Sequence, residues 1–330
     1  MEPPSPTAPP VPPAGDGEAA ALFAPHLRDG RFFNPWGPLR LGLRDVLRWY
    51  RERPWRRPPD RPAPRVDNDG ASLSGHEPGI ACTWVGHSTF TIHHERAVLI
   101  TDPHWGARAL LPPRHTAPGV PLKAVPSAPV ALLSHNHYDH LDRWTVRRLP
   151  ADTRWYVPLG LAAPLRRMGA RHVRELDWWQ EAHDGPFHLS SLPAQHWSNR
   201  VTTPRNASLW CSWLIDIGGE RLYFAGDTGW FPGFAEYGRR FGPLAAALLP
   251  IGAYEPRWFM RYQHIDPAEA VAAATALRAK RLVAMHWGTF VLTDEPLDEP
   301  PRALSRAAAD AGVDPATIVL PAVGERWGIG

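Results

Sequence analysis

The sequence predicts an α/β protein, and two features of the chain point to this class. Short runs rich in β-branched and aromatic residues come first, in closely spaced pairs, and later runs alternate with segments of helical pattern. This order is typical of sheets that are covered by helices in layers. The length of 330 residues and the hydrophobic fraction of 44% fit one large domain or two modest ones and exclude wholesale disorder.

The regular elements are expected after about Gly70. The strand-like runs are residues 82–94, 97–102, 129–135, 209–217, 221–227 and 244–252. Four helices are expected over residues 142–149, 159–168, 233–241 and 300–311. The clearest helix runs from Asp266 to Lys280, because it has a carboxylate at its start and cations at its end.

Two segments of different composition precede this main region, which we assign to residues 71–330. Residues 1–30 are predicted to be a disordered, proline-rich tail, and they lack the basic start and apolar core of a secretory signal. Residues 31–70 form an arginine-rich segment, in which an amphipathic helix is expected after Arg40 and ends at Pro54. Such a helix either lies on an anionic membrane surface or packs on the main domain with its basic face in water.

Composition excludes several classes of protein. No run approaches the roughly 20 apolar residues that cross a bilayer, which excludes an integral membrane protein. The only two cysteines, Cys82 and Cys211, exclude a disulfide framework and suit a reducing cytosol. The formal net charge of +3 is too small to propose nucleic acid as a partner. We therefore expect a cytoplasmic protein, with peripheral contact to a membrane if the arginine-rich segment supplies it.

The run LLSHNHYDHLD is the strongest functional signal in the chain. It places His135, His137, Asp139 and His140 within six residues, directly after an apolar strand. Imidazole and carboxylate ligands together suit a borderline ion such as zinc. Because side chains two apart in an extended segment project to the same side, His135 and His137 are expected to face one ion. Asp139 and His140 can then turn toward a second.

Three more ligand candidates end other apolar runs, namely His196 in SLPAQHWS, Asp227 in LYFAGDTGW and His286 in LVAMHWGTF. Each of them alone has a structural explanation, such as a buried or turn-forming residue. Together they fit one geometry, in which strand ends deliver ligands to a single rim.

The combination of HNHYDH, a distant histidine, GDTG and a late histidine resembles the metallo-β-lactamase superfamily. The resemblance implies a four-layer αβ/βα sandwich with two zinc ions at one edge of the sheets. It assigns His135, His137 and His196 to one zinc and Asp139, His140 and His286 to the other, with Asp227 bridging the two. Iron and manganese accept some of the same ligands, so the identity of the metal stays open.

A narrower resemblance covers the chain from about Phe32 to its C-terminus. The strings SHNHYDHLD, FAGDTGWFP, LPIGAYEPRWFM and YQHIDPAEAV are similar to the family of N-acyl-phosphatidylethanolamine-hydrolysing phospholipases D. This similarity implies that residues 71–330 are a catalytic domain that cleaves a phosphodiester at a membrane surface. The products would be an N-acylethanolamine and phosphatidate, and the family likeness also implies a homodimer.

Roles beyond the metal ligands are expected for several residues. Asp227 would orient the attacking water and take its proton. Asp102 is a candidate partner for a metal-binding imidazole, with a turn-forming role before Pro103 as its alternative. The resemblance assigns Tyr138 and His264 to the substrate, and His264 is also a candidate proton carrier or, alternatively, a capping or surface histidine.

Arg257 and the tryptophans each have two interpretations. Arg257 either pairs with a phosphate through its planar guanidinium or forms a structural ion pair. Five tryptophans near the candidate site either form a groove for acyl chains or pack in the core, and these are Trp105, Trp197, Trp230, Trp258 and Trp287.

Two other functions remain open from the sequence. One is a related metallohydrolase that acts on a soluble ester, lactone or cyclic phosphodiester. The other is a lipid-binding protein that keeps its metal for structure. The full set of seven ligands together with Tyr138 argues against the second, because a structural zinc site is normally closed by four ligands.

Overall fold

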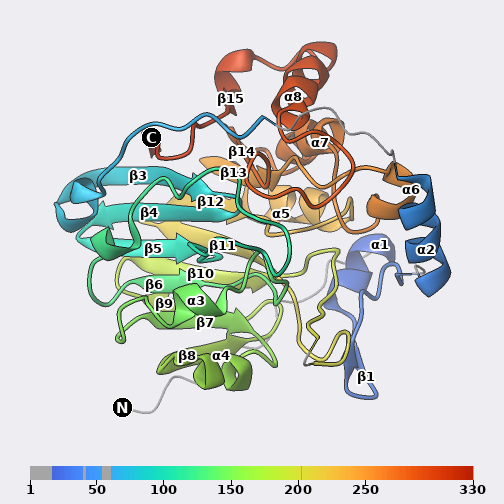
Figure 1. Ribbon diagram of the computed structural model, residues 1–330, viewed down its shortest axis with the longest axis horizontal. Coiled ribbons are helices and arrows are strands. Elements are labelled where there is room, and N and C mark those ends of the chain that lie inside the picture. Colours follow the sequence, from blue (N-terminus) through green and yellow to red (C-terminus); the bar gives the residue numbers. More distant parts are fainter. Residues whose placement is uncertain (1–16, 40–41, 54–60, 202, 330) are drawn as a thin grey trace.

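Two seven-stranded sheets stack face to face, and helices lie on both outer faces (Figure 1). The computed structural model describes residues 17–39, 42–53, 61–201 and 203–329, and every count of strands or helices refers to these residues. The α/β class and the four-layer αβ/βα sandwich expected from the sequence are confirmed.

The N-terminal sheet has the strand order β16-β3-β4-β5-β6-β7-β8. Its strands are β3 (Glu77–Gly86), β4 (Thr89–Glu95), β5 (Ala97–Thr101), β6 (Val130–Leu132), β7 (Arg154–Pro158), β8 (His172–Leu176) and β16 (Arg326–Ile329). β5, β6, β7 and β8 are parallel, whereas β3 and β4 are antiparallel to their neighbours. The carboxyl ends of the parallel strands therefore meet at one edge of the sandwich.

The C-terminal sheet has the order β15-β14-β13-β12-β11-β10-β9. Its strands are β9 (Glu181–Asp184), β10 (Phe187–Leu192), β11 (Ser212–Ile217), β12 (Glu220–Phe224), β13 (Ala246–Pro250), β14 (Leu282–Met285) and β15 (Ile318–Val319). In this sheet β9 to β12 pair antiparallel, and β12 to β15 pair parallel. It thus also has a parallel half whose strands end together.

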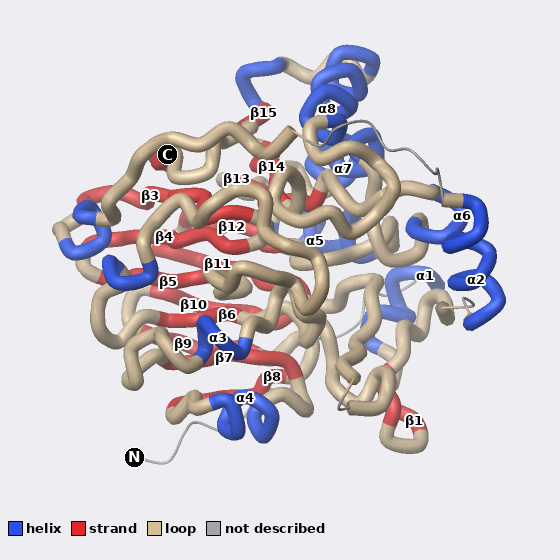
Figure 2. The backbone as a smooth tube through the Cα atoms, in the orientation of Figure 1, coloured by secondary structure: helices blue, strands red, loops and turns tan. Residues whose placement is uncertain are grey.

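The helices confirm the five predicted over the main region (Figure 2). They are α3 (Arg143–Val146), α4 (Ala162–Met168), α5 (Gly233–Phe241), α7 (Pro267–Ala276) and α8 (Glu299–Asp310), and a short α6 (Arg257–Met260) precedes α7. α7 begins with a capping box, since Asp266 and Glu269 each accept a hydrogen bond from the other's backbone N–H. It ends earlier than predicted, because Arg278 adopts a left-handed φ of 56°.

The alternation of side chains along the strands divides the core into two. Leu99 and Leu132 point into the large cluster between the sheets, whereas Val98 and Ile100 join a second cluster on the outer face, under Val146 of α3 and Leu165 of α4. The parallel strands are therefore buried on both faces. This explains why their sequences are continuously apolar.

The predicted amphipathic helix in the arginine-rich segment is confirmed as α2 (Leu43–Glu52), and Pro54 lies outside the described residues. One face of α2 contacts the main domain, where Trp49 Nε1 and Arg53 Nε donate to the carboxylate of Asp294 at 2.7 and 2.9 Å. The helix also exposes Leu43, Leu47 and Tyr50, which are 75%, 59% and 63% exposed and lie at helical spacing. No helix among the described residues is long and apolar enough to cross a bilayer.

The prediction of a disordered tail through residue 30 is wrong for residues 17–30, and residues 1–16 lie outside the described part of the chain. This stretch contains α1 (Gly17–Ala20), a 3₁₀ turn (Ala21–Phe23) and strand β1 (Leu27–Arg28), which pairs with β2 (Arg31–Phe32). Leu22 is only 1% exposed, its carbonyl accepts a hydrogen bond from Trp179 Nε1 at 2.9 Å, and Phe23 stacks on the Trp179 indole. The apolar contacts of Leu22 and Phe23 outweigh the disorder that the proline content predicts.

A pair of leucine substitutions tests this packing. Leu22→Ala should lower the free energy of unfolding by about 2 kcal/mol or more, because it removes buried methyl groups. Leu27→Ala is the matched control, since Leu27 is 54% exposed, and should change stability by less than about 0.5 kcal/mol. Chemical denaturation measures both values, and equal effects would show that Leu22 is not packed as described.

Candidate metal centre

The seven predicted ligands converge at the edge where the parallel strands of both sheets end. The loop after β6 carries His135, His137, Asp139 and His140 from the N-terminal sheet. From the C-terminal sheet, His196 follows β10, Asp227 follows β12 and His286 follows β14. The two sheets therefore contribute opposite walls of one site.

The first group of side chains is formed by His135, His137, His196 and Asp227, whose ligand atoms all lie within 4.8 Å of one another. His137 Nδ1 and His196 Nε2 are 3.2 Å apart. His135 Nε2 and His196 Nε2 each lie 3.8 Å from Asp227 Oδ2. Three nitrogens and one carboxylate oxygen thus face a common point.

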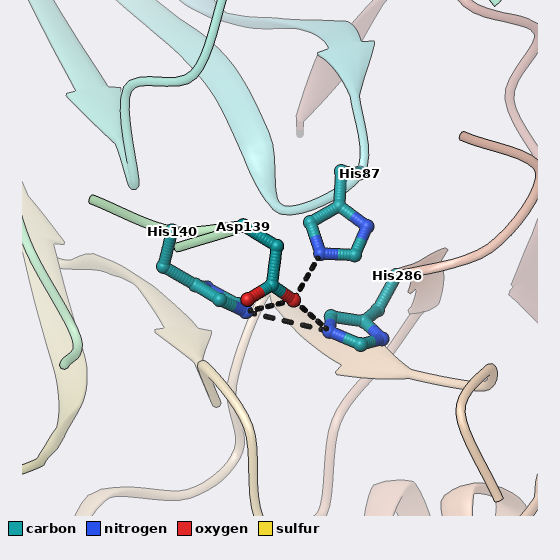
Figure 3. A group of neighbouring side chains, drawn as sticks. All are labelled: His87, Asp139, His140 and His286. Carbon is teal, nitrogen blue, oxygen red and sulfur yellow. Dashed lines mark hydrogen bonds and ion pairs between the residues drawn. The ribbon is translucent and has the colours of Figure 1, made fainter. Parts of the chain in front are cut away.

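The second group contains Asp139, His140 and His286, and also His87 (Figure 3). Asp139 Oδ2 lies 3.4 Å from His140 Nε2 and 3.5 Å from His286 Nε2, and these two nitrogens are 3.3 Å apart. In Figure 3 the two imidazole edges and the carboxylate point toward one another. His87 Nε2 approaches the same carboxylate oxygen at 3.0 Å.

Asp227 joins the two groups. Besides its contacts in the first group, its Oδ2 lies 3.2 Å from His140 Nε2 and its Oδ1 lies 3.0 Å from His286 Nε2. The residue is 3% exposed. A single buried carboxylate therefore contacts imidazoles on both sides of the site.

Hydrogen bonds away from the centre fix the orientation of three imidazoles. His135 Nδ1 contacts Ser134 Oγ at 2.9 Å, and His196 Nδ1 contacts the carbonyl of Gln263 at 3.0 Å. His140 Nδ1 lies 2.7 Å from Asp102 Oδ2. Because a carbonyl or carboxylate requires the proton on Nδ1, the Nε2 atoms of His140 and His196 are left to face the centre.

The protonation of the site is set by burial and by the three carboxylates. Burial lowers the pKa of His135 and His196 well below its ordinary value and that of His137 to about 4, so these rings are neutral at neutral pH. Burial also acts on His140 and His286, but nearby carboxylates dominate and raise the pKa of His140 strongly and that of His286 to about 9.

The two central carboxylates are ionised. Burial opposes the charge of Asp139 and Asp227, yet the neighbouring histidines hold the pKa of both carboxyl groups well below the ordinary value. Without a metal, the protonated imidazoles of His140 and His286 balance these two negative charges. A divalent cation bound here would take the place of those protons.

The donor set fits a divalent cation. The buried atoms His135 Nε2 and His137 Nε2 have no hydrogen-bond partner among the described residues, although unpaired buried polar atoms are costly. Imidazole nitrogens that face each other at 3.2 to 3.3 Å, next to ionised carboxylates, match the ligand set of zinc and similar metals. A cation placed among them satisfies both the orphaned atoms and the negative charge.

Comparison with known proteins decides the family. A family model for the β-lactamase superfamily domain matches residues 96–287, which contain all seven ligand candidates. The chain belongs to the metallo-β-lactamase superfamily. It is a metal-dependent hydrolase of this group. The metallo-β-lactamase fold protein of Bacillus subtilis has the same fold, with a TM-score of 0.53 at 14% identity. The two structures match over 76% of this chain and 99% of that one.

Within the superfamily, the chain is similar to phospholipases of one kind. It is 34% identical over 338 residues to N-acyl-phosphatidylethanolamine-hydrolysing phospholipase D 1 of Caenorhabditis elegans, covering 92% of this chain and 94% of the relative. The mitochondrial protein of the same name from Saccharomyces cerevisiae is 36% identical over 247 residues, which cover 70% of this chain and 52% of that longer relative. The resemblance named from the sequence is confirmed.

Two further predicted residues lie at this metallo-β-lactamase centre. Asp102 follows β5, is fully buried and accepts hydrogen bonds from the backbone N–H and the hydroxyl of Ser134, both at 2.6 Å, besides contacting His140. His264 lies in the turn between α6 and α7, with its ring 5.5 Å from both His196 and His286. Its Nδ1 is buried, has no hydrogen-bond partner among the described residues and lies 3.9 Å from Asp227 Oδ2. The N-terminus of α7 is capped by Asp266 and not by His264.

Arg257 does not face the centre. Its Nη1 donates to the carbonyl of His264 at 2.8 Å, its Nη2 donates to Glu269 at 2.7 Å, and its Nε lies 3.3 Å from Asp266. The prediction that its guanidinium pairs with a phosphate is therefore replaced by its alternative, a structural ion pair. This ion pair holds the turn that carries His264.

Tyr138 and the tryptophans occupy different environments. The Tyr138 ring packs under the Arg200 guanidinium, 3.9 Å away, and its hydroxyl accepts a hydrogen bond from Val201 N. Trp105 and Trp287 are buried in the core, and Trp197 lies 4.6 Å from the His137 ring. The last two tryptophans line a pocket of about 350 Å³ with Pro38 and Leu39, and these are Trp230 and Trp258.

Sequence reasoning missed three residues that support the site. Ser134 and Gln263 bond to ligand imidazoles, and each directly precedes a predicted site histidine. His87 directly follows β3 within the string WVGHSTF, just as other candidate ligands follow strands. Its position directly after a strand was the sequence signal that could have identified His87 as a site residue.

Replacing Asp102 tests the support of His140. Asp102→Asn should weaken the affinity for divalent metal about 10- to 100-fold, because the amide no longer satisfies both His140 Nδ1 and Ser134. Competition against a chromophoric chelator measures the affinity. Asp184→Asn is the matched control, since that carboxylate also accepts hydrogen bonds from Arg154 and Tyr156 but belongs to β9. Equal weakening in both variants would contradict a specific role for Asp102.

Proposed function

We propose that this chain is a zinc-dependent phosphodiesterase of phospholipase D type, which hydrolyses N-acyl-phosphatidylethanolamine-like phospholipids at a membrane surface. The observation that carries the proposal is the single buried carboxylate of Asp227 between two groups of imidazole ligands. The names of the relatives from C. elegans and S. cerevisiae supply the substrate class.

Two zinc ions would be held by the seven side chains, with Asp227 shared between them. The first ion fits His135, His137 and His196, and the second fits Asp139, His140 and His286. When bound, such a pair supplies Lewis acidity toward phosphoryl oxygens and lowers the pKa of water toward about 7.

The chain's own residues then orient the reaction. The ionised carboxylate of Asp227 is a fixed acceptor that orients the attacking water and receives its proton. His264, whose Nδ1 is unpaired among the described residues and lies beside Asp227, is placed to hydrogen-bond a phosphoryl oxygen or the leaving ethanolamine oxygen. Partly exposed His137, Tyr138 and Asp139 mark the open side of the centre, so Tyr138 is retained as a candidate contact for the phosphodiester.

The surroundings of the site support a lipid as substrate. A pocket of about 380 Å³ begins at Asn136, between two ligand histidines, and is lined by apolar Leu161, Pro164 and Met168 with Arg143 and Arg167. The 350 Å³ pocket with Trp230 and Trp258 begins at Gln195 and Tyr262, on the His196 side. Apolar walls with a few cations suit acyl chains attached to an anionic head group.

A lipid panel tests the reaction. Purified protein is incubated with vesicles that contain N-acyl-phosphatidylethanolamine or plain phosphatidylethanolamine, and with a soluble cyclic phosphodiester, ester and lactone. We expect N-acylethanolamine and phosphatidate from the first substrate, detected by mass spectrometry. Turnover of the soluble compounds alone would favour a different metallohydrolase and overturn the proposal.

Replacing Asp227 tests the shared carboxylate. Asp227→Asn should lower turnover about 10³-fold or more, because the amide neither takes a proton nor carries the bridging charge. Bound zinc, measured by elemental analysis, should fall from about two equivalents per chain. Asp310→Asn, at the exposed end of α8, is the control and should retain the turnover and the zinc content of the parent. Unchanged activity in Asp227→Asn would remove its proposed role.

Membrane contact is proposed for α2. Its exposed stripe of Leu43, Leu47 and Tyr50 would enter the interface, while Arg44 and Arg51 attract anionic lipid. The triple substitution of the stripe by serine should weaken vesicle binding at least about tenfold in a sedimentation assay, because the buried apolar area is lost. Leu320→Ser, at a residue 37% exposed elsewhere, should bind like the parent. Undiminished binding of the triple variant would show that another surface contacts the membrane.

A further inference from the structure

His87 is a buried histidine at the metal centre that belongs to neither proposed ligand set. It lies in the turn between β3 and β4 and is 1% exposed. Its ring Nε2 lies 3.0 Å from Asp139 Oδ2, as Figure 3 shows. Its ring also packs on the ring of His286, with centroids 4.0 Å apart.

The backbone of His87 is tied to the same two sides of the site. Its carbonyl accepts hydrogen bonds from His286 N at 3.1 Å and from Trp84 Nε1 at 2.9 Å, and its N–H donates to Thr289 Oγ1 at 2.9 Å. The turn of the N-terminal sheet is thereby fastened to the loop that follows β14 in the C-terminal sheet. His87 thus contacts Asp139 and His286 directly, and its ring centroid lies 5.2 Å from that of His140, the third side chain proposed to bind the second ion.

We propose that His87 is a positioning residue of the second metal subsite, which donates its Nε2–H to Asp139 and supports the ring of His286. The proposal rests on the binuclear centre of the proposed function. His87 would act through Asp139 and His286 and would not itself bind the ion.

The contacts of the three imidazoles separate a positioning role from direct ligation. His140 Nε2 and His286 Nε2 each lie within 3.5 Å of both Asp139 and Asp227. His87 Nε2 has a contact of this kind with Asp139 alone among the described carboxylates. His87 Nε2 thus lacks the contact with the shared Asp227 that both proposed ligand imidazoles make.

The proton count on the His87 ring agrees with this placement. Nδ1 of His87 is buried and has no hydrogen-bond partner among the described residues. With the proton on Nε2, the ring donates a charge-assisted hydrogen bond to an ionised carboxylate and leaves only a lone pair unpaired. A metal on Nε2 would instead require the proton on Nδ1, where it would be a buried donor without an acceptor.

Backbone conformation provides a further, independent observation. His87 and His286 are both non-glycine residues in the left-handed region, with φ of 56° and 64°, and their backbones are hydrogen-bonded to each other. Such conformations cost free energy and persist where the surrounding structure requires them, often at functional sites. At this site they turn both rings toward Asp139.

Two substitutions of His87 separate the donated hydrogen bond from packing. His87→Phe keeps an aromatic ring against His286 but removes the donor, and His87→Gln keeps an N–H donor of similar reach. We expect His87→Phe to weaken the binding of the second zinc equivalent about 10- to 100-fold while the first is retained, because Asp139 loses its anchor. His87→Gln should recover most of the affinity. Chelator competition measures both steps, and the visible spectrum of the cobalt-loaded protein reports the geometry of the second ion.

His93→Phe is the matched control, because His93 is also a buried histidine, 2% exposed, but lies within β4. It should bind both ions like the parent. The rise in melting temperature on adding zinc is measured for the parent and for each variant, at equal fractions of folded protein. A loss of folding in His87→Phe is then not counted as a loss of zinc binding. Parent-like zinc affinity in His87→Phe overturns the proposal. A His87→Gln variant that binds the second zinc as weakly as His87→Phe also overturns it, because that result would indicate direct ligation by His87. Since every readout is metal binding, failure to hydrolyse lipid would count against the proposed function alone.

Discussion

The carboxylate of Asp227 imposes the constraint on which the site depends. It is almost fully buried, and five histidine rings surround it at 3.0 to 3.9 Å. An ionised carboxylate in such a position is stable only with strong positive partners. His135 and His140 reach it from the N-terminal sheet, and His196 and His286 reach it from the C-terminal sheet. The sandwich therefore brings its two halves together around one negative charge, and the proposed pair of cations would satisfy that charge together with the imidazole nitrogens that face it.

The rest of the fold holds these side chains in place. Parallel strands in both sheets end at the same edge, so that short loops after β6, β12 and β14 deliver ligands without long connections. Hydrogen bonds to Ser134, to the Asp102 carboxylate and to the Gln263 carbonyl fix three rings, and the Arg257 ion pair fixes the turn of His264. Around this rigid centre lie two pockets with apolar walls and a helix with an exposed apolar stripe. A polar centre beside apolar surfaces fits the proposed reaction at a lipid interface.

Much of the site could be predicted from the sequence, because its strongest signal is local. Three histidines and one aspartate within six residues leave few explanations other than metal binding, and the remaining ligands end apolar runs. The start of α7 was also predictable from its capping Asp266, and α5 was predicted over its observed range of residues 233–241. Long-range partners were not. The packing of Leu22 on Trp179 is hidden by the surrounding prolines, and the ion pair of Arg257 depends on where α6 and α7 meet. His87 escaped notice because a single histidine in a turn has no spacing pattern, although its contacts join both sheets.

The most direct test of the central claim is anomalous X-ray scattering from crystals of the zinc-loaded protein. Two zinc peaks are predicted, one among His135, His137 and His196 and the other among Asp139, His140 and His286, with Asp227 in contact with both. Their separation should be about 3.5–4 Å, the distance at which a pair of ions can act on one phosphate. A single peak, or two peaks of which one lies away from Asp227, would contradict the account.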